Sequence, residues 1–440
     1  MSTILFALSP ITGHVRPALP VVRALVADGH DVAVYTGSKF APAIRATGAR
    51  VEAMDLGRDL DDARIDEWAA EHHAPAPGVR RLRFDALQHF VLTVPGFVAD
   101  LDAIVARERP DVIVSDNAFI AGPAAGTRHG IPAVMFSVSP LPVTSRDTMP
   151  FGMGLLPPKG PAGRLVARGL RLLIEKVVFR SVQKAAHEIV DELGLPRQRG
   201  FFFDWSQTLA TRTLVASVPG IDYPRSDLPA SVQTVGALLP TGVDAFDEPA
   251  WWGEVRAARE AGRPVVLVTQ GTIATDPRRL LQPALTALAD QDVLVVATAD
   301  PADVDAPANA RVTPFVPFDR LLPFVDVMVT NGGFGGVQLA LSYGVPLVVA
   351  GRSEDKAEVG ARVEWSGVGV RAKVDRQDVT TPAAVRASVR RVLDDERYRV
   401  RAGELAAQYA RYDGVAGVAR AVTELAEVGP RLSRRDACVA

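Results

Sequence analysis

His14 and Asp116 are the residues of this chain best suited to proton transfer, and each stands next to an apolar run that predicts a buried strand. The two runs are Thr3–Ser9 and Asp111–Ser115. The carboxyl ends of parallel strands meet at one edge of a sheet, so we expect His14, on the first loop, and Asp116 to share that edge. An imidazole beside a carboxylate can take up a proton near neutral pH.

A glycine-rich turn between two further apolar runs predicts an anion site. Val325–Thr330 leads into Asn331-Gly332-Gly333-Phe334-Gly335-Gly336, a helical segment follows over Val337–Tyr343, and Val345–Ala350 is the next expected strand. Glycines let a ligand approach the backbone closely, and the free N–H groups at a helix start favour negative charge. A diphosphate suits this arrangement. The same glycines would also serve tight helix–strand packing without a ligand, and the turn alone leaves both interpretations open.

Two apolar stretches stand outside the expected strands. Ser139–Gly160 is rich in proline and glycine and carries Phe151, Met153 and Leu155, which either line an apolar pocket or pack within the loop itself. The aromatic cluster Phe201–Trp205 is expected in the core, with a pocket wall as the alternative.

Composition argues against several function classes. With 440 residues, a net charge of −2 and a pI near 6.4, the chain has no basic footprint for nucleic acid. The single cysteine, Cys438, allows no disulfide framework, and the pair His72-His73 lacks a metal-ligand motif, so we expect a solvated segment and no metal. We find no leader-like N-terminus and no run near the ~18–20 apolar residues that cross a bilayer. A cytoplasmic protein without stable membrane insertion is expected.

Alternating strand and helix patterns predict an α/β fold with two doubly wound parallel sheets. Residues 1–238 form the expected N-terminal domain, and residues 251–428 the expected C-terminal domain. The linker between them is expected over Leu238–Ala250, which has prolines, acidic residues and no periodicity. The last helix is expected to pack back on the first domain.

Three motifs carry a family resemblance. They are Gly13-His14-Val15-Arg16-Pro17, Gln270-Gly271-Thr272, and the block from Phe315-Val316-Pro317 through Asp355 to Arg362. In order and spacing they resemble the family 1 glycosyltransferases of the GT-B fold, in which two Rossmann-like domains face a cleft. The bacterial natural-product branch, often labelled macrolide glycosyltransferases, is the most similar.

The resemblance implies inverting, metal-independent transfer of a hexose from a UDP- or dTDP-sugar to a hydroxyl of a lipophilic small molecule. It makes His14 the general base and Asp116 its orienting partner. The nucleotide sugar is a co-substrate, and no cofactor is implied. The resemblance makes the N-terminal domain the acceptor-binding one, with Phe151, Met153 and Leu155 on the acceptor, and the C-terminal domain the nucleotide-sugar-binding one. The base would lie on Phe315-Val316, the sugar hydroxyls on Asp355, and the diphosphate on the glycine turn with help from Thr272. The residues implied for the donor are Gly271, Thr272, Phe315, Val316, Asn331, Gly332, Gly333, Gly335, Gly336, Gln338, Glu354, Asp355 and Lys356.

Four departures from the family pattern bear on the donor. Asn331 stands where the family usually has histidine, and Gly336 where Ser or Thr often binds phosphate. The ribose-binding glutamate aligns with Leu339, which mildly suits a deoxyribose. Lys356 replaces glutamine after Asp355.

Two other readings stay open at this stage. A catalytically inactive GT-B-fold auxiliary or binding protein is the main alternative, suggested by Asn331, Leu339 and Lys356. A nicotinamide oxidoreductase is disfavoured because Gln338 occupies the last glycine position of the dinucleotide fingerprint. The acceptor's identity and the oligomeric state are not readable from the sequence.

Overall fold

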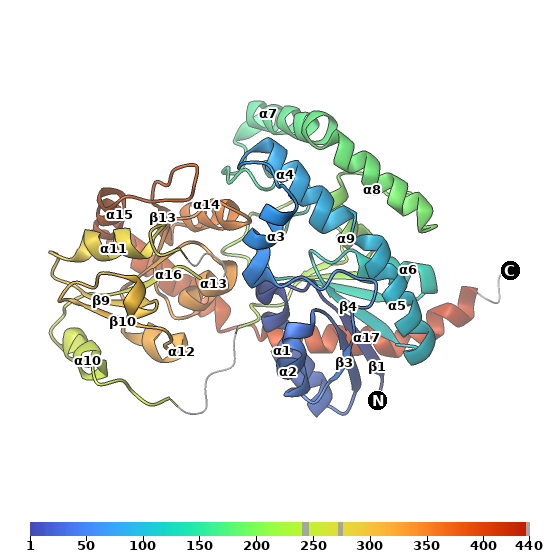
Figure 1. The fold of residues 1–440 in the computed structure, drawn as a ribbon, viewed down its shortest axis with the longest axis horizontal. Helices are drawn as coiled ribbons and strands as arrows, with labels where there is room; N and C mark the ends of the chain where they lie inside the picture. Colours follow the sequence, from blue (N-terminus) through green and yellow to red (C-terminus); the bar gives the residue numbers. More distant parts are fainter. Residues whose placement is uncertain (240–245, 272–275, 437–440) are drawn as a thin grey trace.

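The computed structural model describes residues 1–239, 246–271 and 276–436, and in them the chain forms two parallel sheets (Figure 1). The N-terminal sheet has the order β3-β2-β1-β4-β5-β6-β7 and the C-terminal sheet the order β10-β9-β8-β11-β12-β13. This confirms the α/β fold class with two doubly wound sheets. The strands are β1 (Thr3–Ala7), β2 (Asp31–Tyr35), β3 (Arg50–Glu52), β4 (Val112–Asp116), β5 (Ala133–Ser137), β6 (Arg212–Val215), β7 (Val232–Thr234), β8 (Val265–Thr269), β9 (Leu294–Thr298), β10 (Ala310–Thr313), β11 (Val327–Thr330), β12 (Leu347–Val349) and β13 (Gly369–Arg371).

The central strands are apolar on both faces because helices cover both sides of each sheet. Every residue of β4, β5 and β8 is buried, as parallel strands between two helical layers require. The register between β1 and β4 pairs Ile4 with Val112 and Ala7 with Ser115, so the two strands end side by side.

Nine α-helices precede the expected linker within the described ranges. They are α1 (Thr12–Ala27), α2 (Ala41–Arg45), α3 (Ile65–Glu71), α4 (Val79–Asp85), α5 (Val94–Glu108), α6 (Ala121–His129), α7 (Gly160–Leu173), α8 (Arg180–Glu192) and α9 (Trp205–Leu209). Short 3₁₀ or π turns flank them at η1 (Ser38–Phe40), η2 (Asp62–Arg64), η3 (Ala86–Val91), η4 (Ile174–Val178) and η5 (Phe202–Asp204).

Helix α1 begins earlier than expected. His14 was expected on the loop before this helix, but the helix starts at Thr12 and contains both Pro17 and Pro20. His14 therefore lies in the first helical turn and not on a loop. The expectation was wrong because a proline inside a helix costs one hydrogen bond, which argues for a later helix start. Here Val15, Ala18 and Val22 of the helix are buried, and their packing offsets that cost.

The segment expected to be merely solvated, 55–78, contains helix α3. His72 stacks on Trp68 with ring centroids 4.1 Å apart, and His73 follows in a left-handed conformation with φ 49°. No group of three or more His, Cys, Asp or Glu side chains that could hold a metal ion occurs in the described part of the chain. Metal independence itself stays a prediction.

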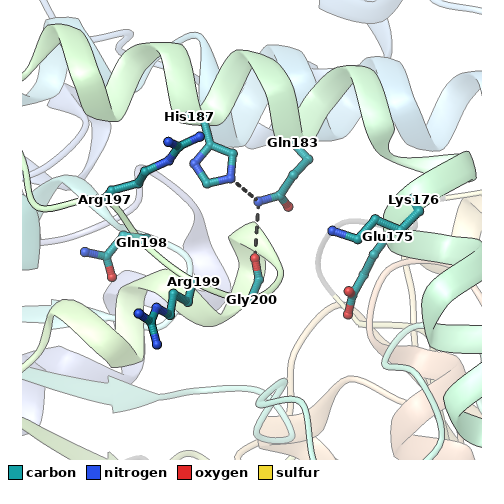
Figure 2. A pocket seen from close by; sticks show the side chains of 8 residues that line it. All are labelled: Glu175, Lys176, Gln183, His187, Arg197, Gln198, Arg199 and Gly200. Atoms are coloured by element: carbon teal, nitrogen blue, oxygen red, sulfur yellow. Dashed lines mark hydrogen bonds between the residues drawn. The ribbon is translucent and has the colours of Figure 1, made fainter.

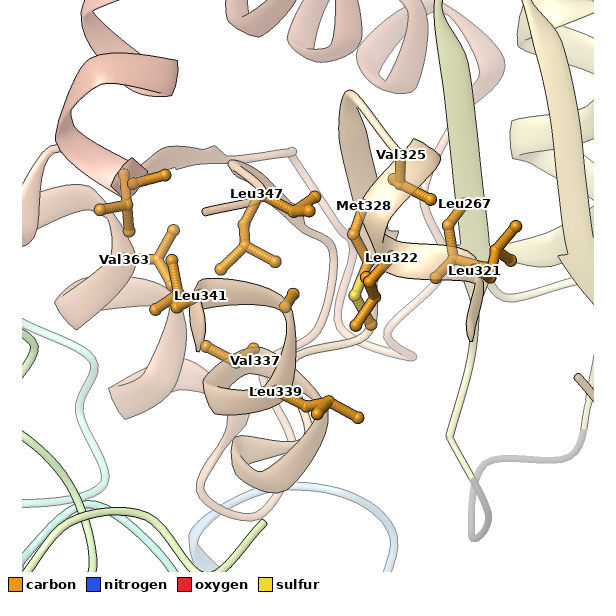
Figure 3. Close-up of a cluster of buried hydrophobic side chains, with 14 of the residues drawn as sticks. Leu267, Leu321, Leu322, Val325, Met328, Val337, Leu339, Leu341, Leu347 and Val363 are labelled. Carbon is orange, nitrogen blue, oxygen red and sulfur yellow. The ribbon is translucent and has the colours of Figure 1, made fainter. Parts of the chain in front are cut away.

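The C-terminal sheet is covered by α10 (Trp252–Glu260), α11 (Leu281–Leu288), α12 (Phe318–Leu321), α13 (Phe334–Ser342), α14 (Lys356–Ser366), α15 (Pro382–Asp394) and α16 (Glu396–Tyr409), with short turns η6 (Pro301–Asp303) and η7 (Leu322–Phe324). Figure 3 shows part of its core, where side chains of β8, α13 and α14 meet. Residues 240–245 of the expected linker lie outside the described residues, and the expected domain boundaries stay predictions.

The last helix, α17 (Gly414–Asp436), leaves the C-terminal sheet and runs along the N-terminal one (Figure 1). Val418, Val422 and Leu425 share a core cluster with residues of β1, α1 and β4. The polypeptide thus crosses between the two halves twice, and each half contributes to the other's packing.

One continuous helical stretch in the described ranges, Val79–Glu108, is long and apolar enough by composition to cross a membrane. Half of its most apolar window is buried inside the protein, as in a core helix. The sequence predicts a mostly helical segment over these residues but no continuous apolar run of spanning length, because polar residues interrupt it.

Candidate active site

The N-terminal sheet reverses its winding between β1 and β4, and this is where His14 and Asp116 lie. Strand order runs one way from β1 to β3 and the other way from β4 to β7. In doubly wound sheets the crevice at this reversal is the usual ligand site, because the two following segments diverge there. His14 follows β1 at the start of α1, and Asp116 is the last residue of β4.

The side chains of His14 and Asp116 form a hydrogen bond of 2.6 Å between Nδ1 and Oδ1. The Asp116 carboxylate also accepts the backbone N–H of Ser9 at 2.7 Å, its hydroxyl at 3.1 Å, and the N–H of Ala118 at 2.9 Å. Asp116 is fully buried, whereas 19% of the His14 side chain is exposed. A carboxylate fixed this way holds the proton on Nδ1 and leaves Nε2 of His14 as the acceptor.

The electrostatics of this pair favour a charged imidazole. Burial by itself would lower the pKa of His14, but the carboxylate of Asp116 raises it above its ordinary value, with Asp355 and Glu354 adding to the effect. Burial by itself would raise the pKa of Asp116, but His14 and the N–H donors lower it. Asp116 is thus ionised, and the site stabilises the imidazolium that forms when His14 takes a proton.

A second carboxylate anchors the helix that carries His14. Asp62 is 3% exposed and accepts the backbone N–H of Thr12 at 2.7 Å and its hydroxyl at 3.1 Å. Lys39 in turn pairs with Asp62 and, at 2.9 Å, with Asp61. The sequence analysis missed Asp62 because it lies in a segment that reads as solvated. Asp62 is 50 positions from Thr12 along the chain, so no local pattern connects the two residues.

The C-terminal sheet has its own reversal between β8 and β11, and the glycine-containing turns lie there. Gln270-Gly271 follows β8, and Asn331-Gly332-Gly333 follows β11. The side-chain N–H of Asn331 donates to the Gln270 carbonyl, which joins the two strand ends. Asn331 is 7% exposed, and its side chain would meet a Cβ at Gly271 at 3.4 Å. Asn331 therefore ties the turns together.

The glycine turn leaves open space at the start of α13. A Cβ added at Gly333 or Gly335 would meet nothing within 4 Å, whereas one at Gly336 would meet Met328 at 3.7 Å. Position 332 requires glycine, because its φ is 99° and a Cβ there would lie 2.8 Å from the Val349 side chain. Val337 is the first residue of α13 whose N–H bonds back to the turn, at 3.1 Å to Gly333. The N–H of Gly332 donates to the Thr330 hydroxyl at 3.2 Å and that of Gly333 to the Asn331 side-chain oxygen at 3.4 Å. The N–H groups of the first helical turn, from Phe334 to Gly336, are the ones left for an anion.

Helix α14 begins beside this turn and brings three charged residues. Lys356 is 5% exposed, and its Nζ donates to Glu354 at 2.7 Å and to Ser353 at 3.3 Å. Its stem passes the turn, since a Cβ at Gly332 would lie 3.5 Å from that of Lys356. Burial, and next Glu354, raise the pKa of Asp355 to about 6. The carboxylate of Asp355 also helps to raise the pKa of His14.

Among the residues expected to bind the donor, Gln338 lies away from the glycine turn, and Phe315 and Val316 differ in exposure. Gln338 is 4% exposed and faces Tyr409 of α16, whose hydroxyl donates to it at 3.4 Å, so the structure does not bring it to the turn. Leu339 lies in the core cluster of Figure 3. The Phe315 side chain is 67% exposed and free to stack, whereas Val316 is buried at 3%. Thr272 lies outside the described residues.

The loop expected to bind the acceptor docks on α14. Phe151, Met153 and Leu155 keep 37%, 41% and 38% of their surface exposed. Between them, the N–H groups of Gly152 and Gly154 donate to one carboxylate oxygen of Glu358 at 3.0 and 2.9 Å. Nothing in the described part of the chain places these three apolar side chains against His14, so their role in binding an acceptor stays a prediction.

Glu358 belongs to a buried ionic chain between the domains. Arg362, 1% exposed, donates to Glu358 at 2.8 Å and to Asp222 at 2.7 Å, and its guanidinium lies 4.3 Å from the Tyr223 ring centroid. Arg371 adds a hydrogen bond to the Gly154 carbonyl at 2.8 Å. Sequence reasoning found Arg362 only as the end of a motif, and no local signal pointed to Glu358 or Asp222.

An apolar pocket adjoins the chain just after Asp116. Its lining includes Asn117, the next residue along the chain, together with Phe90 and three members of the aromatic cluster, Phe202, Phe203 and Trp205. Phe202 and Trp205 are also buried in the core, at 5% and 1% exposure. The aromatic cluster is therefore core and pocket wall at once.

Two family models match the chain. Residues 281–425 match the model described as "Erythromycin biosynthesis protein CIII-like, C-terminal domain", and residues 12–203 match the "Glycosyl transferase 4-like domain". Among curated relatives, 4'-demethylrebeccamycin synthase of Lentzea aerocolonigenes is 42% identical over 414 residues, 94% of this chain and 96% of that one. UDP-glycosyltransferase 2 of Phaeomoniella chlamydospora is 32% identical and spans 96% of this chain and 95% of its own.

Solved structures share the fold. The calicheamicin glycosyltransferase CalG4 superposes with a TM-score of 0.72 at 22% identity, over 97% of this chain and 98% of that one. A spinosyn rhamnosyltransferase complexed with thymidine diphosphate gives a TM-score of 0.67 at 19% identity, over 96% of this chain and all of that one. At these identities the likeness concerns the GT-B fold alone.

Proposed function

This chain belongs to the family 1 glycosyltransferases of the GT-B fold, in the natural-product branch, and from that premise we propose the reaction it catalyses. The enzyme transfers a hexose from a UDP- or dTDP-sugar to a hydroxyl of a lipophilic small molecule, with inversion at the anomeric carbon and without a metal ion. A macrolide, a polyketide, a phenol or an antibiotic is the expected kind of acceptor.

The observation that carries this proposal is the 2.6 Å bond between His14 and the buried carboxylate of Asp116 at a sheet reversal. An alcohol is a poor nucleophile until its proton is removed. Nε2 of His14 takes that proton while the alcohol oxygen attacks the anomeric carbon. The bond from that carbon to the diphosphate oxygen breaks, and the diphosphate leaves with the electron pair. A single displacement inverts the centre.

The second domain supplies the leaving-group side. Backbone N–H groups at the start of α13 receive the charge that develops on the diphosphate, so no general acid is needed. Asp355 binds hydroxyls of the sugar, and Phe315 stacks on the base. Lys356 adds a positive charge beside the turn. In sequence, Leu339 stands where the family has the glutamate that binds the ribose hydroxyls. Leucine cannot accept those hydrogen bonds, so a deoxyribose donor is compatible. Both UDP and dTDP stay candidates.

A donor screen tests the proposal. UDP- and dTDP-sugars are offered with a panel of hydroxylated lipophilic acceptors, and products are identified by mass, each reaction with and without EDTA. We expect a hexose adduct, equal in both arms. Activity only without EDTA would contradict metal independence. No product from any pair, together with no thermal stabilisation by millimolar UDP or dTDP, would overturn the proposal.

A further inference from the structure

Helix α7 and the turn η4 expose an apolar stripe that no described part of the chain covers. Along one side of this helix, Leu165 is 71% exposed, Val166 56%, Leu172 50%, Leu173 50% and Val177 60%. Spacings of four, seven and eight residues place them on one helical face. Ala167 is the only residue of α7 that is fully buried. Contiguous exposed apolar surface of this kind usually marks a docking site.

The stripe is flanked by positive charge. Between Lys159 and Lys184 every charged side chain except Glu175 is a cation. Arg171 turns inward to the Ser145 carbonyl at 2.6 Å, and Arg164 pairs with Asp147 at 3.2 Å. Exposed cations of this segment are Arg164, Arg168, Lys176, Arg180 and Lys184.

A cationic pocket adjoins the end of the stripe (Figure 2). It has a volume of about 520 Å³ and lies between η4, α8 and the loop 196–200. Lys176, Arg197 and Arg199 line it, and none of the three forms an ion pair with a carboxylate in the described chain. Glu175 is the one acidic lining residue, and burial raises its pKa. Lys176 joins the two features, since it lines the pocket and directly precedes Val177.

We infer that this surface, the α7–η4 stripe with the Lys176/Arg197/Arg199 pocket, docks the enzyme on an anionic phospholipid bilayer. A helix with one apolar face and flanking cations lies in the membrane interface, with its apolar side chains among the acyl chains and its cations at the phosphates. The charges of this segment are almost all positive, which matches an anionic membrane surface better than the mixed charges of a protein partner. The pocket holds a phosphate headgroup between its three cations. Docking is peripheral and needs no spanning helix.

The docked orientation places the acceptor loop next to lipid. Gly160, the first residue of α7, directly follows the stretch that carries Phe151, Met153 and Leu155. Figure 1 shows α7 and α8 along the outer edge of the N-terminal domain, away from α17. An apolar acceptor that partitions into the bilayer would therefore be concentrated where this loop ends, at the start of α7.

Vesicle sedimentation of the full-length protein tests the inference. Wild type is mixed with vesicles of phosphatidylcholine alone or with phosphatidylglycerol added, at low and high salt. We expect binding only to the anionic vesicles, weakened by salt. Leu165→Ser/Leu173→Ser should weaken binding by roughly tenfold or more. Lys176→Gln/Arg197→Gln/Arg199→Gln should weaken it by at least about tenfold. Val400→Ser, an equally exposed apolar site on α16, is the matched control and should bind as wild type.

Unfolding temperatures close to that of wild type show that the variants fold. The inference is overturned if anionic vesicles do not bind the protein, or if the stripe variant binds like wild type. Stabilisation by inorganic phosphate without vesicle binding would identify a free-anion site and also overturn it. So would a dimer in light scattering that the stripe variant dissociates, because the stripe would then be a contact between copies.

Discussion

The carboxylate of Glu358 in the C-terminal domain accepts the backbone N–H of Gly154 in the N-terminal domain at 2.9 Å. Glu358 lies one helical turn after Asp355, the residue expected to bind the donor sugar. Gly154 lies between Met153 and Leu155, which are expected to bind the acceptor. The two substrate sides are therefore connected through the first turn of α14.

Gly154→Ala should weaken acceptor binding. Gly154 has a φ of 58°, and a Cβ would lie 2.7 Å from the Ala357 carbonyl oxygen, so the loop must lift from α14. We expect the acceptor KM to rise by roughly tenfold, with little change in the donor KM. Steady-state kinetics with the acceptor and donor found by the screen measure both.

Gly152→Ala is the matched control, because Gly152 also has positive φ, 91°, but a Cβ there meets nothing within 4 Å. It carries the same kind of backbone strain without the clash. If both substitutions had equal effects, backbone strain in the loop would determine acceptor binding, and the contact of the loop with α14 would not.

Asp116→Asn should move the acidic limb of the pH profile of kcat/KM to lower pH. Transfer needs neutral His14, so activity rises as pH passes the pKa of His14. Asp116 raises that pKa, and the neutral amide removes the effect. Maximal activity should fall as well, because the imidazolium loses its stabilising charge. A limb that stays in place would show that another group limits activity at low pH.

Gly335→Ala should impair donor binding without harming the fold. The added Cβ meets no protein atom within 4 Å, and alanine in a helix is more stable than glycine by roughly 0.5–1 kcal/mol. Only a ligand at the start of α13 would clash. We expect the Kd of UDP or dTDP in calorimetry to rise by roughly tenfold or more.

Gly403→Ala in α16 provides the comparison, since its Cβ also meets nothing within 4 Å. It should leave nucleotide binding unchanged. If Gly335→Ala binds nucleotide as well as this control, the diphosphate does not lie over the glycine turn.

Lys356→Gln should change donor preference more than acceptor preference. The buried ammonium lies beside the turn and pairs with Glu354, so its loss removes a positive charge from the donor side. Ratios of kcat/KM across UDP- and dTDP-sugars measure the effect. Glu354→Gln keeps the ammonium and should shift these ratios less. A uniform decrease for all donors would contradict the assignment.

The sequence predicted the strands and the dyad well for one physical reason. Parallel strands buried on both faces appear as short apolar runs, so Asp111–Ser115 lies within one residue of the bounds of β4, and Val325–Thr330 within two residues of those of β11. Strand ends then located His14 and Asp116 at one edge. The helix start at Thr12 was missed because Pro17 resembles a first-turn proline.

The connections between distant segments were not predictable from local pattern. Asp222 and Arg362 are 140 positions apart, and Glu358 meets Gly154 across 204 positions. Each pairing depends on how the two domains settle against one another. Likewise, Gln338 looked available beside the glycine turn, but the rotation of α13 directs it towards Tyr409.

The assignment of His14 as the base is tested most directly by measuring transfer and nucleotide binding in the same variant, His14→Ala. We expect kcat to fall by roughly 10²–10⁴-fold, while the Kd for UDP or dTDP stays within about twofold of wild type, because the nucleotide binds the other domain. Unchanged turnover would contradict the account.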